Sequence, residues 1–293
     1  MNLMLQGNAL LALAAAVLWG GGDFSGGMGV RYAGGTIPAT VRVVMLSHAA
    51  SLSVLVAIAL LRGDAFPHGA PLAWGVSAGV TGGLSLMCFY VALSRGAMGT
   101  SAALSGLLAA AIPAAVAITQ LGSPGWMHIA GFLVAGASIW VIAAGENPES
   151  KPVDTVTTWL AIVAGAGFGV YFVELKYAGS SGVIWPLATA RMGSLTLCLL
   201  LSAAMAVKGG MGKVTVTRKV ALWAGWAALL DTSGNGLFLA ATRAGRLDVA
   251  AVLASLYPAS TILLAAWMLH EKPTRRQGWG MALAAAAVVM ITL

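Results

Sequence analysis

Apolar residues run in long stretches along this chain, and short polar segments separate them. Ten stretches are long enough to cross a bilayer, since a membrane-spanning helix needs about 20 mostly apolar residues. The pattern predicts an all-α polytopic membrane protein with ten transmembrane helices. The predicted helices are Gly7–Met28, Thr36–Leu61, Leu72–Leu93, Met98–Leu121, Trp126–Ala144, Thr158–Ala178, Ile184–Ala206, Val220–Thr242, Val249–Leu269 and Gln277–Leu293.

Composition supports this fold class. The chain is 59% hydrophobic and 9% charged, with mean hydropathy +0.89, which excludes a water-soluble globule. Its 16 Lys and Arg exceed 9 Asp and Glu, but they are spread over short loops, which indicates membrane orientation and not nucleic-acid binding. The first stretch has no Lys or Arg before it, so we expect a first transmembrane helix and not a cleaved signal peptide.

Two parts of the chain resemble one another. Residues 30–42 read VRYAGGTIPATVR, and residues 175–191 read LKYAGSSGVIWPLATAR. Arg42 and Arg191 differ by 149 positions, whereas Pro113 and Pro258 differ by 145. We therefore predict two five-helix repeats, residues 1–150 and 151–293, in one membrane domain. Five is an odd number, so the second repeat must enter the membrane from the opposite side, and such inverted repeats are typical of secondary transporters.

The segment 250–280, AAVLASLYPASTILLAAWMLHEKPTRRQGWG, resembles the signature of EamA-type members of the drug/metabolite transporter superfamily. It has a central Pro, a Glu at the end of the span and Gln-x-x-Gly opening the last helix. Residues 89–113 and WGGGDF at 19–24 resemble a bacterial branch of the superfamily, although Gln120-Leu-Gly stands where the family commonly has Gly-Glu. The resemblance implies a carrier of small organic solutes, often an exporter, with a central cavity lined mainly by spans 1, 3, 4, 6, 8 and 9.

The expected function is secondary-active transport of small organic metabolites such as amino acids by alternating access, in the cell (inner) membrane. No ATP-binding motif is present, so energy would come from the solute gradient or from protons. No metal or other cofactor is expected, because the chain has no His-Glu-x-x-His and no cysteine cluster. The expected partners are a small-molecule substrate and the lipid bilayer, with protons left open, and the chain would be a monomer or homodimer.

Orientation and function both have alternatives. The loop charge count places both termini outside, whereas many relatives have them inside. A channel would have a compatible sequence, and only flux kinetics separate it from a carrier. Gly20-Gly21-Gly22-Asp23 matches the Gly-x-Gly-Asp of intramembrane aspartyl proteases, with Asp231 as a second acid, but that family has a Tyr-Asp span first.

Charges inside the spans are the first candidates for chemistry, because each costs about 2.5–3.5 kcal/mol to insert. They are Asp23, Arg42, Glu174, Lys176, Arg191 and Asp231. Each repeat offers a carboxylate and an arginine on consecutive helices, so Asp23–Arg42 and Glu174–Arg191 could form structural ion pairs. Alternatively, the arginines bind a substrate carboxylate, or Asp23 carries a proton. The glycines around Asp23 permit either close packing or a break in the helix.

Asp231 and Asn235 project from the same face of their helix, four residues apart. They have no polar counterpart in the first repeat, which indicates a substrate or cation site, although a hydrogen bond between helices is the structural alternative. His48 could carry a proton but is more simply explained as a hydrogen-bonded structural residue.

Aromatic residues on the spans expected to line the cavity are Trp19, Tyr90, Trp185 and Tyr257. Trp19 lies one turn before Asp23, and Tyr257 precedes Pro258, so these two and Tyr90 are predicted to be binding residues. Trp and Tyr also gather at membrane interfaces. The tryptophans that begin their spans are therefore predicted to be interface anchors, and they are Trp74, Trp126, Trp159, Trp223 and Trp279.

Overall fold

The computed structural model describes residues 2–94, 98–143, 154–210, 216–268 and 274–292, and within these ranges all regular structure is helical. The helices are α1 (Asn2–Tyr32), α2 (Ile37–Arg62), α3 (Ala70–Ser94), α4 (Met98–Leu121), α5 (Trp126–Ala143), α6 (Thr155–Ala178), the 3-10 turn η1 (Gly179–Ser181), α7 (Ile184–Val207), α8 (Arg218–Ala244), α9 (Leu247–Ala254), α10 (Tyr257–Met268) and α11 (Arg275–Thr292). The predicted span ends Ala144, Leu269 and Leu293, and the family-signature Glu271, lie outside the described residues.

Six helices of the described chain are long and apolar enough to cross a membrane. They cover Gly7–Tyr32, Ile37–Arg62, Ala70–Leu93, Leu104–Leu121, Thr155–Ser181 and Ile184–Val207. The stretch predicted at Val220–Thr242 lies in the helix α8, which is not one of the six, because the polar run Asp231–Asn235 interrupts its apolar sequence.

The prediction of one continuous helix at Val249–Leu269 is wrong, because Ser255 and Leu256 separate α9 from α10. Pro258 explains the break, since proline has no N–H and its ring disfavours helical backbone before it. Pro113 lies inside α4, which continues without interruption. The two prolines therefore have different effects at positions that the sequence comparison treats as equivalent.

Helix ends follow local sequence signals. Thr36 caps α2 by accepting a hydrogen bond from the Ala39 N–H at 3.3 Å, and Gly63 ends the helix with a left-handed φ of 68°. Asp154 caps α6 in the same way, accepting from the Thr157 N–H at 2.7 Å. These signals fix where helices begin and end, but not which helices pack together.

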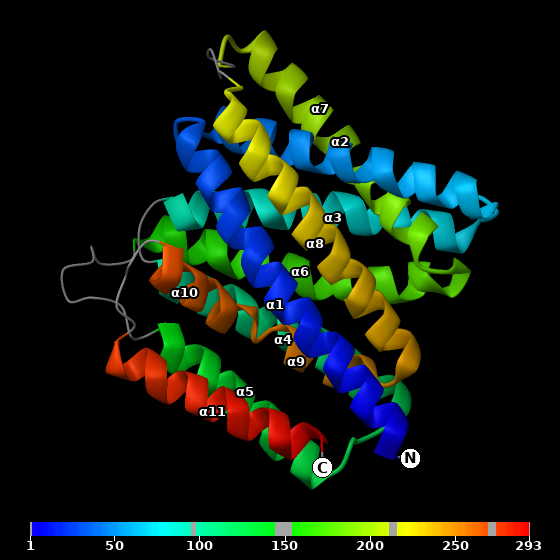
Figure 1. Ribbon diagram of the computed structural model, residues 1–293, viewed down its shortest axis with the longest axis vertical. Helices are drawn as coiled ribbons and strands as arrows, with labels where there is room; N and C mark the ends of the chain where they lie inside the picture. Colours follow the sequence, from blue (N-terminus) through cyan, green and yellow to red (C-terminus); the bar gives the residue numbers. More distant parts are fainter. Residues whose placement is uncertain (1, 95–97, 144–153, 211–215, 269–273, 293) are drawn as a thin grey trace.

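The packing joins helices that are far apart in sequence. α1 lies along α8, α3 lies along α6 and α7, α2 packs on α7, and α5 packs on α11 (Figure 1). α4 contacts α6 and α9, and α10 contacts α1. Consecutive helices such as α1 and α2, or α6 and α7, make few contacts with each other. The interior is therefore built mainly between the first five helices and the later ones.

Glycine permits a close crossing of α3 and α7. A Cβ on Gly79 would overlap the Ala190 carbonyl oxygen, and one on Gly193 would overlap the Val76 carbonyl oxygen. Small residues at helix interfaces are how membrane helices bring their backbones together. This crossing positions Arg191, which follows Ala190 on α7.

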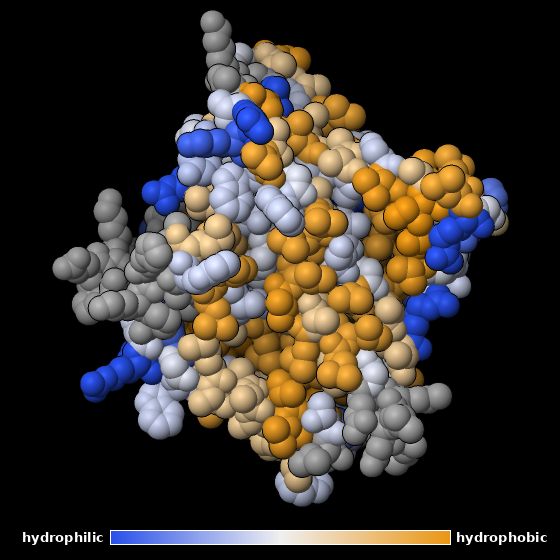
Figure 2. Space-filling view, in the orientation of Figure 1, coloured by the Kyte–Doolittle hydropathy of each residue, from blue (hydrophilic) through white to orange (hydrophobic). Residues whose placement is uncertain are grey.

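The outer surface is largely apolar. Leu61, Trp126, Val207 and Trp267 are each at least 75% exposed, and apolar residues cover much of the face in Figure 2. Among the predicted interface anchors, Trp126, Trp159 and Trp279 are 75%, 61% and 72% exposed, and Trp74 is 40% exposed. Trp223 is partly buried and packs edge-on against Phe24. Such a surface is suited to lipid and would be unfavourable in water.

Candidate functional site

An ion pair between α7 and α8 lies at the centre of the candidate site. Arg191 Nη2 donates to Asp231 Oδ2 and also to Thr232 Oγ1, the latter at 3.2 Å. Asn235 Nδ2 donates to the same Asp231 oxygen at 3.1 Å, which confirms that Asp231 and Asn235 share a helix face. The Arg191 side chain is 7% exposed and that of Asp231 is 30% exposed. Asp231 therefore supplies the counter-charge for a buried guanidinium.

His48 on α2 holds the other side of this guanidinium. Arg191 Nη1 donates to His48 Nε2 at 3.1 Å, and His48 Nδ1 lies 2.6 Å from Ser194 Oγ. Arginine can only donate hydrogen bonds, so Nε2 must be the unprotonated acceptor and Nδ1 must carry the ring proton. His48 is thus a neutral imidazole with both nitrogens bonded, in line with the structural explanation of this residue.

Asp23 on α1 faces the same network from a third helix. Its carboxylate interacts electrostatically with that of Asp231, and also with the hydroxyls of Tyr90 and Tyr257. Gly22 makes this approach close, because a Cβ there would lie 3.2 Å from the Asp231 backbone nitrogen. Within the described chain Asp23 makes no hydrogen bond and no ion pair. It is therefore an acid close to the ion pair but not neutralised by it.

Glu174 and Arg42 do not join the Arg191–Asp231 pair. Glu174 Oε1 accepts from Ser77 Oγ at 2.5 Å, while its Oε2 is buried without a hydrogen-bond partner in the described chain. Arg42 is partly buried, and the described residues give it neither a hydrogen bond nor an ion pair. The ion pairs considered from sequence, Asp23–Arg42 and Glu174–Arg191, do not form, because α1 and α2, like α6 and α7, pack mainly on other helices.

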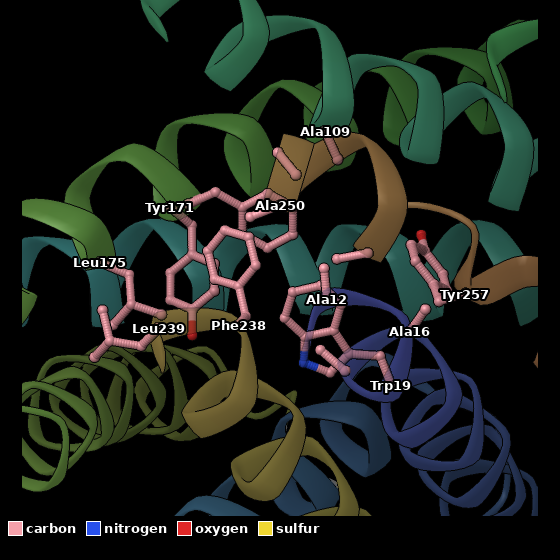
Figure 3. Close-up of a cluster of buried hydrophobic side chains, with 14 of the residues drawn as sticks. Ala12, Ala16, Trp19, Ala109, Tyr171, Leu175, Phe238, Leu239, Ala250 and Tyr257 are labelled. Carbon is pink, nitrogen blue, oxygen red and sulfur yellow. The ribbon is translucent and has the colours of Figure 1, made fainter. Parts of the chain in front are cut away.

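The aromatic residues are buried beside the network. Trp19 stacks on Phe172 with ring centroids 5.0 Å apart and an interplanar angle of 2°, and it contacts Phe238 at 5.4 Å. Figure 3 shows Trp19, Phe238 and Tyr171 close together, with Tyr257 to one side. Gly234, next to Asn235, gives Trp19 its space, since a Cβ there would lie 2.6 Å from the indole. The rings form a wall between α1, α6 and α8.

Three other predicted aromatic positions have defined contacts. The Tyr90 hydroxyl lies against Gly26 of α1, where no side chain could be accommodated without a shift. The Tyr257 hydroxyl lies 3.5 Å from Ser105 Oγ. Trp185 instead donates its Nε1 to the Asp64 carbonyl oxygen at 2.8 Å and packs edge-on against Phe66, so it belongs to a helix end and not to the polar network.

Sequence reasoning missed four polar or aromatic residues that interact with the candidate site residues. They are Ser77, Tyr171, Ser194 and Thr232. Thr232 could have been found from its place beside Asp231. The other three lie on separate helices in apolar surroundings, and nothing local distinguishes them from small or aromatic packing residues.

Comparisons with known proteins add the following. Residues 156–293 match the model of the EamA-like transporter family. No curated protein matches the chain. A solved structure described only as "Crystal structure of protein" superposes with a TM-score of 0.69 at 18% sequence identity, covering 97% of this chain and 95% of that one. At this identity, the similarity establishes the shared fold alone.

Proposed function

The chain belongs to the EamA-like transporters of the drug/metabolite transporter superfamily, and on this basis we propose that it is a secondary-active carrier of small organic metabolites. Amino acids are the substrate class that we favour. The observation that carries this proposal is the polar network inside apolar helices, in which α7 contributes Arg191, α8 Asp231 and α1 Asp23. Intramembrane charges are costly and mark substrate or ion pathways.

Alternating access would use two inverted five-helix repeats, residues 1–150 and 151–293. In this architecture α9 and α10 together make the ninth of ten spans. The packing supports it, because the first helix of each repeat lies on the third helix of the other, in the pairs α1–α8 and α3–α6. The second helices pair as α2–α7 and the fifth as α5–α11. Such reciprocal pairing is expected for two halves related by a two-fold axis.

We propose distinct roles for the site residues. Arg191 and Arg42 would bind a substrate carboxylate, and Asp231, Asn235 and Glu174 would hold polar groups or a proton. Asp23 is the group proposed to carry a coupling proton, since it faces Asp231 without a basic partner in the described chain. Trp19, Tyr90 and Tyr257 would contact the apolar part of the solute.

Transport would occur in the cell (inner) membrane, with export as the favoured direction and the solute gradient or protons as the energy source. The working unit would be a monomer or homodimer. A shared-proton dyad of an aspartyl protease is not supported, because Asp231 is paired with Arg191 and is not free to share a proton with Asp23.

Counterflow in liposomes tests the proposal. Purified protein is reconstituted with a mixed pool of unlabelled amino acids inside, and entry of labelled amino acids is followed with and without a pH gradient. A carrier accumulates label transiently, and the Asp23→Asn variant should abolish this. Asp64→Asn is the matched control, since Asp64 pairs with Arg62 at a largely exposed helix end.

The remaining outcomes are also informative. Acceleration of counterflow by the pH gradient supports proton coupling. Downhill flux without counterflow would support a channel and overturn the carrier. No flux with any amino acid would overturn the substrate class, and the same assay with amines, nucleosides and sugars would then follow.

A further inference from the structure

The Arg191 guanidinium uses only part of its hydrogen-bonding capacity. Nη1 donates to His48, and Nη2 donates to Asp231 and Thr232. The Nε–H group is buried and has no acceptor in the described chain. A buried charged donor without an acceptor is unusual and costly. The Nε–H therefore points to an acceptor that comes from outside the protein.

Asp231 contacts the guanidinium through a single oxygen. Its Oδ2 accepts from both Arg191 Nη2 and Asn235 Nδ2, whereas Asp231 makes no bond to Nε. A carboxylate and an arginine can instead form two parallel hydrogen bonds across Nε and Nη2, which is the stronger geometry. A second carboxylate could form this two-bond contact only by taking Nη2 from Asp231.

The surroundings decide what happens to a displaced Asp231. The titratable groups that face the pair are Asp23 from α1, His48 from α2, Tyr90 from α3 and Tyr171 from α6, and Tyr171 also interacts with Glu174. None of them is an additional cation, and His48 would lose its bond from Arg191 if Nε2 took a proton. A displaced, ionised Asp231 would lie beside Asp23 without a counter-charge, which is unfavourable in a low-dielectric interior.

We propose that a ligand carboxylate binds across Nε and Nη2 of Arg191 in exchange for Asp231, and that Asp231 takes up one proton as it is displaced. The proton comes from water and forms an O–H bond on the Asp231 carboxyl, and no covalent bond of the ligand changes. The ligand class is a solute with a carboxylate group. This inference rests on the proposed function, because it names the substrate class of the carrier and the residue that couples substrate to proton.

In this mechanism Asp231 couples the proton to the substrate, which differs from the role proposed above for Asp23. His48 is a positioning residue: it holds Nη1 and so keeps the Nε–Nη2 edge directed at the ligand. The linkage is reciprocal, so protonation of Asp231 must strengthen carboxylate binding by the same factor by which the carboxylate favours protonation.

Acetate, the smallest stable organic carboxylate probe, tests the exchange without any transport measurement. The full chain, labelled with ¹⁵N-arginine, is placed in lipid nanodiscs, and the Nε–H resonance of Arg191 is followed during acetate titrations at several pH values. Arg191→Lys assigns the resonance. We expect acetate to shift it with an affinity that falls about tenfold per pH unit once Asp231 is ionised. Acetamide, which has the same shape without the charge, should leave it unmoved.

Two variants locate the proton. Asp231→Asn should bind acetate with no pH dependence, whereas Asp23→Asn should still take up one proton with each acetate, because Asp231 remains. A pH-independent affinity in the unmodified chain would overturn the proposal, as would acetate that leaves the Arg191 resonance unmoved. Loss of the dependence in Asp23→Asn would assign the proton to Asp23 instead. If Asp231→Asn does not fold, the unmodified chain and Asp23→Asn still decide between these outcomes.

Failure of this inference can be distinguished from failure of the proposed function. The titration measures binding at equilibrium, and counterflow measures exchange of solute. If the protein catalyses counterflow of amino acids but its acetate affinity does not depend on pH, the proposed exchange at Asp231 is refuted and the carrier function stands. If acetate binds with the expected pH dependence but the protein shows no counterflow, the binding site stands and the carrier function is refuted.

Discussion

Removing either member of the Arg191–Asp231 pair should destabilise the protein far more than removing both. In Asp231→Leu, the guanidinium of Arg191 keeps its bonds to His48 and Thr232 but loses its counter-charge, while its side chain is only 7% exposed. Breaking a buried pair in this way costs about 3–5 kcal/mol. We expect a value near the lower end, about 3 kcal/mol, because Asp231 is 30% exposed and the site is partly accessible to solvent.

Removing the arginine should lower the free energy of unfolding by less than removing the aspartate. In Arg191→Met the volume is nearly kept, and Asp231 retains the hydrogen bond from Asn235 at 3.1 Å. We expect about 1–3 kcal/mol, the usual range for a buried polar group that loses one partner. The double variant Arg191→Met/Asp231→Leu replaces the pair by apolar side chains, and such replacements are often neutral or stabilising. The coupling energy should then be about 3 kcal/mol or more.

Equilibrium unfolding in mixed micelles, followed by tryptophan fluorescence and circular dichroism, measures the four free energies of unfolding. The matched control is the same cycle at Arg62 and Asp64, whose side chains are 64% and 32% exposed, and an exposed pair of this kind is worth about 0–1 kcal/mol. The reasoning is refuted if the two single variants at the buried pair cost less than about 1 kcal/mol each and add up in the double variant.

Three further predictions follow from other contacts. Gly79→Ala should cost about 1–3 kcal/mol in the same unfolding assay, because its Cβ would overlap the Ala190 carbonyl, whereas Gly27→Ala, with nothing within 4 Å, should be nearly neutral. His48→Leu removes the acceptor for Arg191 Nη1 and should cost about 1–3 kcal/mol; a smaller loss than in Gly27→Ala would contradict the bond at 3.1 Å. Arg42→Ala should abolish counterflow while expression and stability remain, since the described chain gives Arg42 no partner to lose. A loss of folded protein as large as the loss of counterflow would instead assign Arg42 a structural role.

The sequence determined the helices and the residues worth testing. The predicted stretch Met98–Leu121 is the observed α4, and Thr36–Leu61 differs from α2 by one residue at each end. An apolar stretch of this length has to form a helix in a bilayer, because each backbone polar group must be bonded within its own segment. The fixed helical repeat likewise puts Asp231 and Asn235 on one face, and the bond between them follows.

Only the tertiary structure decided which charges meet. The depth of a residue in its span says how far it lies from the loop, but not toward which neighbour it points. Consecutive helices suggested Glu174 as the partner of Arg191, yet α6 packs on α3 and α4, and Arg191 reaches Asp231 of α8 instead. The contact partners of a helix are set by close packing of small residues such as Gly79 and Gly193 across the whole bundle, and that information is not local to any stretch of the chain.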